Sequence, residues 1–179
     1  MKKKVLIISA SPRRGGNSDT LCNRFMQGAE EVGHEVEKIF LKDCNIHFCT
    51  GCGTCSNLHK PCPQKDDAAG IVAKMVEADV IVMATPVYFY TMNAQMKTLI
   101  DRTCARYTEI SHKEFYFIVA AAEENKSDME RTIEGFRGFT YCLEGAQEKG
   151  IIYGVGAWQV GEIKDKPAMM EAYEMGKAV

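Results

Sequence analysis

Short apolar runs alternate with amphipathic stretches along most of this chain. Continuous apolar runs indicate strands buried on both faces of a sheet, and an alternating run indicates an outer strand. The predicted strands cover residues 4–9, 35–41, 79–85, 115–121 and 151–155. Apolar spacings of three and four residues predict helices over residues 17–33, 67–76, 92–103, 128–149 and 164–177. Strands that alternate with helices in this way predict an α/β domain with a mostly parallel sheet, covered on both faces.

The composition is that of a folded domain. With 179 residues, 46% hydrophobic and 26% charged, the sequence suits a single domain over residues 1–179. A formal net charge of −2 leaves no basic field, so no nucleic-acid partner is expected. No apolar run approaches the roughly 18 to 20 residues of a membrane span. The apolar stretch after the opening lysines is too short for a signal peptide, so we expect a cytoplasmic protein without a membrane partner.

The loop after the first predicted strand has the chemistry of a phosphate site. Two consecutive glycines allow the backbone to approach an anion, and a helix N-terminus follows with unpaired N–H groups. Ser11, Arg13 and Ser18 can add direct hydrogen bonds. The alternative is a tight turn in which Asn17 is an ordinary helix cap. No Gly-Lys-Ser/Thr follows, so this is not a Walker loop.

Two further loops should meet the first one, because ligands of such sheets bind beyond the carboxyl ends of the strands. Pro86 is expected to end the third strand, and Tyr88, Phe89 and Tyr90 follow it. Three consecutive aromatic residues suit the wall of a planar ring system, although packing against a partner subunit is an alternative. Residues 121–125 offer small side chains where a ring could lie close. A phosphate pocket, an aromatic wall and a small-residue floor together suggest flavin mononucleotide (FMN).

The eight cysteines fall into two groups. Four are scattered, which is typical of small buried apolar residues: Cys22, Cys44, Cys104 and Cys142. The other four crowd into a predicted loop at about residues 44–66, with two, two and six residues between them: Cys49, Cys52, Cys55 and Cys62. Pro63 follows the last, as in ferredoxin-type iron–sulfur motifs, and Gly51 and Gly53 would let the loop wrap around a cluster. Four thiolates could equally hold zinc, with His47 or His59 as substitutes, and a loop without metal is the third possibility.

Two of these loops together resemble a known family. Residues 9–13 with 17–18, then 85–88, then 93–101, are similar to the flavodoxin-like NAD(P)H-dependent FMN reductases. The cysteine cluster followed by Asp66 and Asp67 resembles the iron–sulfur flavoprotein branch of that superfamily. The likeness runs from the first strand to about residue 106 and is weaker beyond it.

The resemblance implies a flavodoxin-like three-layer sandwich, with a five-stranded parallel sheet in the order 2-1-3-4-5. It implies FMN at the loop cluster, NAD(P)H as a transient co-substrate, and homodimers or homotetramers whose interfaces complete the flavin sites. Carried over by position, the cofactor-binding residues would be Ser9, Ser11, Arg13, Asn17, Ser18, Pro86, Val87, Tyr88, Phe89 and Asn93. A [4Fe-4S] cluster, where present, would be held by Cys49, Cys52, Cys55 and Cys62.

Three functions follow from these observations. The first is an enzyme, an FMN-dependent oxidoreductase that passes reducing equivalents from NAD(P)H to a flavin, quinone or similar small-molecule acceptor. Such an enzyme needs no protein acid or base, because the cofactor carries the chemistry. The second is an iron–sulfur flavoprotein that carries electrons with a ferredoxin partner. The third is a flavin- or metal-binding interaction protein without turnover.

Overall fold

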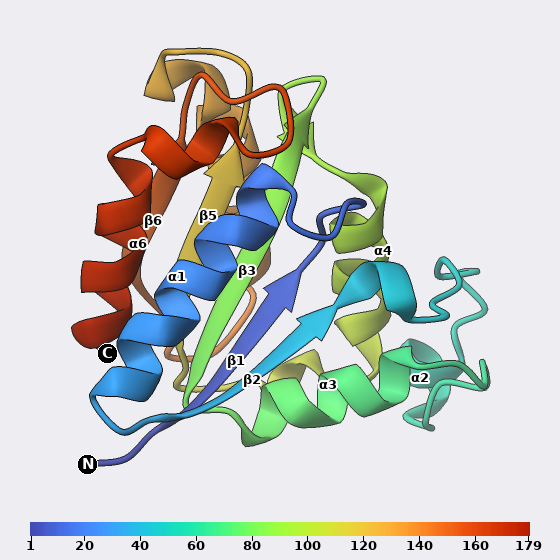
Figure 1. The fold of residues 1–179 in the computed structure, drawn as a ribbon. Helices are drawn as coiled ribbons and strands as arrows, with labels where there is room; N and C mark the ends of the chain where they lie inside the picture. The colour runs from blue at the N-terminus through green and yellow to red at the C-terminus, as the bar shows by residue number, and fades with distance from the viewer.

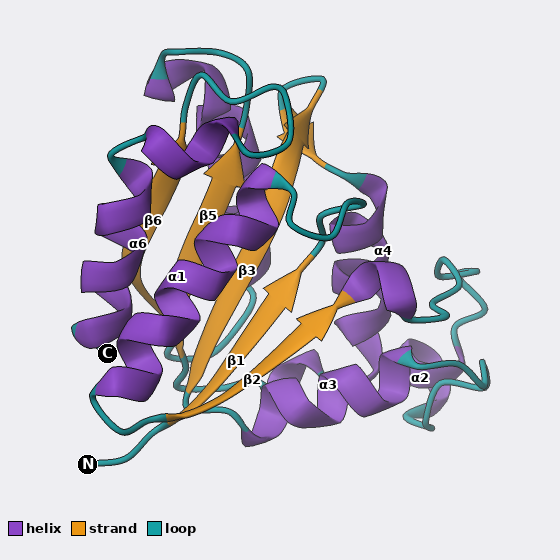
Figure 2. Ribbon diagram, viewed as in Figure 1, coloured by secondary structure: helices purple, strands orange, loops and turns teal.

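The computed structural model describes residues 1–179 and places one twisted sheet between two layers of helices (Figure 1, Figure 2). The strands are β1 (Lys4–Ser9), β2 (Glu35–Phe40), β3 (Val80–Tyr88), β4 (Thr91–Met92), β5 (Glu114–Ala120) and β6 (Gln147–Gly154). The long strands run parallel in the order β2-β1-β3-β5-β6, and β4 pairs antiparallel with β3. Counted without the two-residue β4, this order is the predicted 2-1-3-4-5, so the fold class is confirmed.

The helices divide between the two faces of the sheet. They are α1 (Asn17–Glu31), α2 (Thr54–Leu58), α3 (Ala68–Glu77), α4 (Ala94–Arg102), α5 (Glu130–Thr140) and α6 (Ala168–Lys177). Short 3-10 turns lie at η1 (Leu41–Asp43), η2 (Thr103–Ala105), η3 (Tyr107–Glu109), η4 (Lys126–Met129) and η5 (Glu162–Asp165). α1 and α6 cover one face, and the side chains of α3, α4 and α5 join the core on the other (Figure 1).

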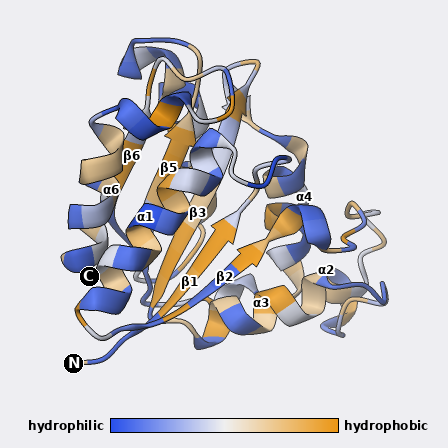
Figure 3. Cartoon of the chain, in the orientation of Figure 1, coloured by the Kyte–Doolittle hydropathy of each residue, from blue (hydrophilic) through white to orange (hydrophobic).

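Each strand feeds both cores because successive side chains point to opposite faces. In β1, Val5 and Ile7 pack under α1, whereas Leu6 and Ile8 pack under the opposite helices. The inner strands are therefore apolar over most of their length, while the helices carry polar residues on their outer side (Figure 3). Because these strands run parallel, the carboxyl ends of β1, β3, β5 and β6 lie at one edge of the sheet.

The end of β3 differs from its prediction. Pro86 was expected to end this strand, but β3 continues through it to Tyr88. Pairing between β1 and β3 stops at Ala84, whereas Pro86 is still aligned with Ala120 of β5. Proline lacks a backbone N–H and is tolerated where a strand has a free side. The strand then turns back as β4, a hairpin that the apolar pattern did not reveal.

The region after α5 also differs. A helix was predicted over residues 128–149, but α5 ends at Thr140 and β6 already begins at Gln147. Between them the chain is not helical: Leu143 is buried and Gly145 adopts a φ of +65°. The first residues of β6 are polar and exposed, so the apolar run at 151–155 showed only the inner part of the strand.

The predicted cysteine loop contains one short helix, α2. The 3-10 turn η1 lies directly before the loop. None of the helices has the length and apolar character needed to cross a membrane.

Candidate functional site

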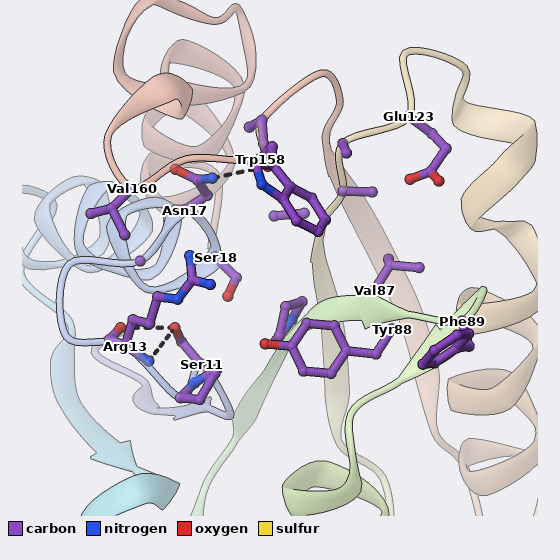
Figure 4. A pocket seen from close by; sticks show the side chains of 17 residues that line it. Ser11, Arg13, Asn17, Ser18, Val87, Tyr88, Phe89, Glu123, Trp158 and Val160 are labelled. Atoms are coloured by element: carbon purple, nitrogen blue, oxygen red, sulfur yellow. Dashed lines mark hydrogen bonds between the residues drawn. The ribbon is translucent and has the colours of Figure 1, made fainter.

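A cavity of about 310 Å³ lies at the carboxyl edge of the sheet, which is within the usual size range of small-molecule sites. Four chain segments line it: residues 11–18, which lead from β1 into α1; residues 86–89 of the β3–β4 hairpin; residues 120–123 after β5; and residues 157–160 after β6 (Figure 4). This is the position where sheets of this topology bind ligands.

The β1–α1 loop forms a preset cradle at one end of the cavity. The Ser11 hydroxyl donates to the carbonyl oxygen of Arg13 at 2.8 Å and lies 3.2 Å from the Arg13 backbone N–H. A Cβ on Gly16 would lie 2.5 Å from Ser11 Oγ and 2.9 Å from Arg13 O, so only glycine fits there. The loop therefore closes around Gly16 and presents the start of α1 to the cavity.

Ser18 carries an unsatisfied hydroxyl in this cradle. Its Oγ is buried and has no hydrogen-bond partner, although buried hydroxyls are normally paired. The cap position of α1 has no side-chain hydrogen bond either, so the first-turn N–H groups and the positive helix end are available. Arg13 is exposed at the mouth and forms no ion pair, unlike Arg14, which pairs with Asp43. These donors fit a phosphate group.

Ser9 does not reach the cavity. It is fully buried and its hydroxyl donates to Asp19 Oδ1 at 3.0 Å. The Asp19 carboxylate also accepts from the Gly15 N–H at 3.0 Å and from Lys38 Nζ at 2.9 Å. The structure thus assigns Ser9 to a network behind the cradle, which holds the loop through Gly15, rather than to the predicted ligand contacts.

Asn17 borders the cavity, but its side-chain amide is already used. Its Nδ2 donates to the carbonyl oxygens of Ala157 and Gln159, both at 3.0 Å. Its Oδ1 accepts from the backbone N–H of Gly161 at 3.2 Å. The amide therefore ties α1 to the loop after β6.

The other end of the cavity is apolar and aromatic. Pro86, Val87, Tyr88 and Phe89, which the resemblance places at the flavin ring, line the cavity together with the small residues 120–122. The hairpin turn is unusual because Phe89 and Tyr90 adopt φ values of +49° and +61°. Two-residue hairpins of this kind normally use Asn-Gly, so aromatic residues here carry backbone strain.

Asn93 supports this hairpin from behind. It is 1% exposed and does not line the cavity. Its Oδ1 accepts from the Met96 N–H at 3.2 Å and caps α4, and its Nδ2 donates to Ala10 O at 2.5 Å. Asn93, which the resemblance names as a cofactor-binding residue, thus joins the β1 loop to the segment before α4 and does not line the cavity.

Sequence reasoning missed several lining residues, above all Trp158, Val160 and Glu123. Trp158 is the only tryptophan of the chain and directly follows a glycine-rich stretch. That combination was a usable signal. It was overlooked because no apolar periodicity marks the segment.

The cysteine cluster lies apart from this cavity, on the extended chain around α2 (Figure 2). Cys49 and Cys52 are exposed, and Cys55 and Cys62 are half-buried. Gly51 and Gly53 adopt the positive φ values that a tightly wrapped loop requires. Sulfur donors suit an iron–sulfur or zinc centre, but no three metal-binding side chains converge on one point in this arrangement. The loop supplies the donors without a preformed ligand sphere.

Arg102 reaches the same loop from α4. It is buried, and its Nη2 lies 3.5 Å from Cys62 Sγ while both terminal nitrogens hold the Asp66 carboxylate. Hydrogen bonds from this guanidinium lower the pKa of Asp66 to about 2. A Thr54 hydrogen bond lowers the pKa of Cys52, which favours its thiolate form.

We compared the sequence with models of known protein families. The family model described as NADPH-dependent FMN reductase matches residues 3–132. This chain belongs to that family. An iron-sulfur flavoprotein of Archaeoglobus fulgidus is 39% identical over 99 residues, which are 55% of this chain and 44% of the relative.

Two further comparisons place this FMN reductase family member among known proteins. The iron-sulfur flavoprotein MJ1083 of Methanocaldococcus jannaschii is 43% identical over 100 residues, 56% of this chain and 51% of its own. The chain therefore matches about half the length of each of these two curated relatives. An FMN-dependent NADH-azoreductase of Bacillus anthracis, solved with FMN, has a TM-score of 0.75 at 17% identity over 99% of each chain, which shows the common fold.

Proposed function

We propose that this protein binds FMN in the cavity and acts as an oxidoreductase that passes reducing equivalents from NAD(P)H to a flavin, quinone or similar acceptor. The unpaired hydroxyl of Ser18 beside the open start of α1 is the observation that carries the proposal. A phosphate oxygen would satisfy both. The aromatic and small residues at the other end of the cavity then suit a planar ring.

The residues of the chain have distinct tasks in this proposal. Ser11, Ser18 and the backbone around Gly16 hold the phosphate, and Arg13 neutralises its charge from the mouth of the cavity. Tyr88 and the hairpin exclude water from the ring end. Bound FMN would supply the redox chemistry, by accepting a hydride and passing two electrons on. No side chain needs to act as a general acid or base.

Flavin analysis of the purified protein tests the proposal. FMN should be released on denaturation and identified by mass, whereas FAD alone would contradict it. Arg13→Ala should weaken FMN binding by roughly 10- to 100-fold, the equivalent of about 1.5 to 3 kcal/mol for a charge-assisted hydrogen bond. Arg14→Ala is the matched control, because Arg14 pairs with Asp43 outside the cavity. Its FMN affinity should stay at the wild-type value.

The exposed hairpin supports assembly as part of this proposal. Phe89 is 100% exposed, beside half-exposed Tyr88 and Tyr90. A second copy of the chain over this hairpin, in a homodimer or homotetramer, would cover the apolar surface and shield the ring end of the cavity. Light scattering should report a particle of at least twice the 20.0 kDa chain mass. A monomer at micromolar concentration would contradict this part.

An iron–sulfur electron carrier that works with a ferredoxin is the second candidate. Its support is the Cys49–Cys62 spacing, which ends beside the buried guanidinium of Arg102, together with the names of the archaeal relatives. Iron and sulfide analysis after anaerobic reconstitution tests it. A flavin-containing protein that takes up no iron would exclude the carrier and retain the reductase.

A further inference from the structure

Trp158 faces the cavity from the side opposite Tyr88 (Figure 4). Trp158 is 70% exposed, so its indole is not packed into the core. It lies on the loop between β6 and η5, a segment to which neither the family resemblance nor the family match, which ends at residue 132, assigns a role. A large aromatic side chain left open at a cavity mouth is a surface for a ligand.

The backbone that carries Trp158 is fixed from the side of α1. The Asn17 amide holds the carbonyl oxygens of Ala157 and Gln159, the residues on either side of the tryptophan. The same amide receives the Gly161 N–H. The donors and the acceptor of the Asn17 side-chain amide are thus all used by this loop. The loop is therefore held in place before any ligand binds.

A second group fixes the loop from within. The Glu162 carboxylate Oε2 accepts the backbone N–H of Trp158 at 2.7 Å and that of Gln159 at 2.9 Å. Trp158 thus has a constrained backbone and an unpacked ring. Because the backbone is already fixed, binding has to order only the side-chain torsions of Trp158, which lowers the entropy cost of recognition.

We propose that Trp158 is a specificity-determining residue that stacks on a planar aromatic electron acceptor in this cavity, and that Asn17 and Glu162 are the residues that position it. The inference rests on the proposed oxidoreductase function and adds the residue that selects the acceptor. Compact inorganic acceptors, which offer no ring face, gain nothing from the indole.

The experiment compares two acceptors on the FMN-loaded protein. Menadione is a planar quinone, which NAD(P)H and a proton convert to the hydroquinone with release of NAD(P)+. Ferricyanide takes single electrons and has no aromatic face. Trp158→Ala should lower kcat/KM for menadione by about 5-fold or more relative to the change for ferricyanide, since loss of aromatic stacking costs at least about that much. Trp158→Phe should restore most of this ratio.

Two controls separate this role from a general structural one. Tyr141→Ala removes an aromatic residue of similar exposure that does not line the cavity, and its acceptor ratio should equal that of wild type. Asn17→Ala and Glu162→Ala, which remove the hydrogen bonds to the loop, should shift the ratio in the direction of Trp158→Ala. An unchanged ratio in Trp158→Ala would overturn the inference, and so would a loss of FMN affinity that accounts for the whole effect.

Fluorescence provides a readout that does not depend on turnover. Because Trp158 is the only tryptophan, tryptophan emission under excitation that does not excite the tyrosines reports on this one ring. Menadione should quench it saturably, and ferricyanide should quench it only by collision. Failure of wild-type protein to bind FMN would refute the proposed function. Normal FMN binding and turnover without saturable quenching would refute only the role of Trp158.

Discussion

The guanidinium of Arg102 forms a bidentate ion pair with the carboxylate of Asp66. Nη1 lies 2.5 Å from Oδ2 and Nη2 lies 3.0 Å from Oδ1, with side chains only 2% and 0% exposed. Nη1 also donates to the His47 carbonyl oxygen at 2.7 Å, and the Asp66 carboxylate receives the His47 N–H at 2.9 Å. The pair therefore fastens the start and the end of the cysteine loop to α4.

This pair predicts an acid-sensitive component of stability. Arg102 lowers the pKa of Asp66 from 3.8 to about 2. The ionised carboxylate therefore stabilises the folded state fully above about pH 4, and its contribution of roughly 2 kcal/mol disappears as the pH falls from about 4 to about 2. Urea unfolding as a function of pH should show this loss in wild type. Asp66→Asn should lack it.

The same variant should be strongly destabilised at neutral pH. Asp66→Asn leaves a buried guanidinium without its counter-charge, at a cost of about 3 to 5 kcal/mol in the free energy of unfolding. The matched control is Glu109→Gln, which breaks the exposed Arg106–Glu109 pair and should cost at most about 1 kcal/mol. Equal effects of the two variants would contradict the assignment of Arg102 and Asp66 as the anchor of the loop.

Gly16→Ala should weaken flavin binding without unfolding the protein. The backbone at Gly16 has a φ of −62°, which alanine adopts freely, so the effect is purely steric. The new Cβ would lie 2.5 Å from Ser11 Oγ and would force the cradle open. We expect FMN affinity to fall by about 10-fold or more, as for the loss of one good phosphate hydrogen bond, measured by flavin fluorescence titration.

Gly70→Ala is the control for that substitution. A Cβ at Gly70 would meet nothing within 4 Å, and the position lies inside α3. Alanine there should raise the stability by up to about 1 kcal/mol and leave the FMN affinity alone. Normal flavin binding by Gly16→Ala would show that the phosphate does not lie in the β1–α1 cradle.

The hairpin turn at Phe89 and Tyr90 should lower the stability of the chain while its aromatic rings support assembly. Both residues have positive φ, which costs L-residues roughly 1 to 2 kcal/mol each. The double variant Phe89→Asn, Tyr90→Gly supplies the residues that this turn prefers, and Phe89 loses no packing because it is fully exposed. We expect the free energy of unfolding to rise by about 1 to 2 kcal/mol while the particle mass in solution falls.

Phe48→Asn is a suitable comparison for that hairpin. Phe48 is also exposed, at 72%, but is not among the residues with positive φ. The Phe48→Asn substitution should therefore change the free energy of unfolding by no more than about 0.5 kcal/mol. A hairpin variant that is less stable than wild type would mean that the aromatic rings contribute packing that outweighs their backbone strain.

Apolar periodicity was sufficient for the fold because each inner strand is buried on both faces. It was insufficient at β4 and at the start of β6, since two residues of hairpin and three polar residues carry no periodic signal. It also misplaced the end of β3. Whether Pro86 ends a strand depends on which neighbours run beside it, and a single sequence does not contain that information.

The candidate site divides in a similar way. Ser11, Ser18 and Tyr88 line the cavity because their loops follow strands that end at the same edge. Ser9 and Asn93 have the same polar chemistry but face inward, where they bind Asp19 and Ala10. Residue type predicts hydrogen-bonding capacity, whereas direction depends on the local backbone. Long-range contacts such as those of Asn17 with the loop after β6 are set by tertiary packing alone.

The cysteines should separate into a reactive group and an inert residue. Cys22 is fully buried, and burial raises its pKa to about 12, so its thiol should not react with iodoacetamide in the folded protein. Exposed Cys52, whose pKa is lowered by Thr54, should react fastest near neutral pH. Mass mapping after brief alkylation measures both rates. Modification of Cys22 at the rate of Cys52 would contradict the described burial.

Reconstitution with iron and sulfide under anaerobic conditions then tests whether the clustered thiols act together. If a cluster forms, alkylation of Cys49, Cys52, Cys55 and Cys62 should fall in parallel, because each is a ligand. Cys142 is the internal control. It is exposed and follows α5, outside the cysteine loop, so it should stay reactive. Protection of only one or two of the four thiols would argue against a four-cysteine cluster. A Cys22→Ala variant should lose packing energy, at most a few kcal/mol, yet retain the same pattern of protection, because Cys22 belongs to the core under α1 and not to the loop.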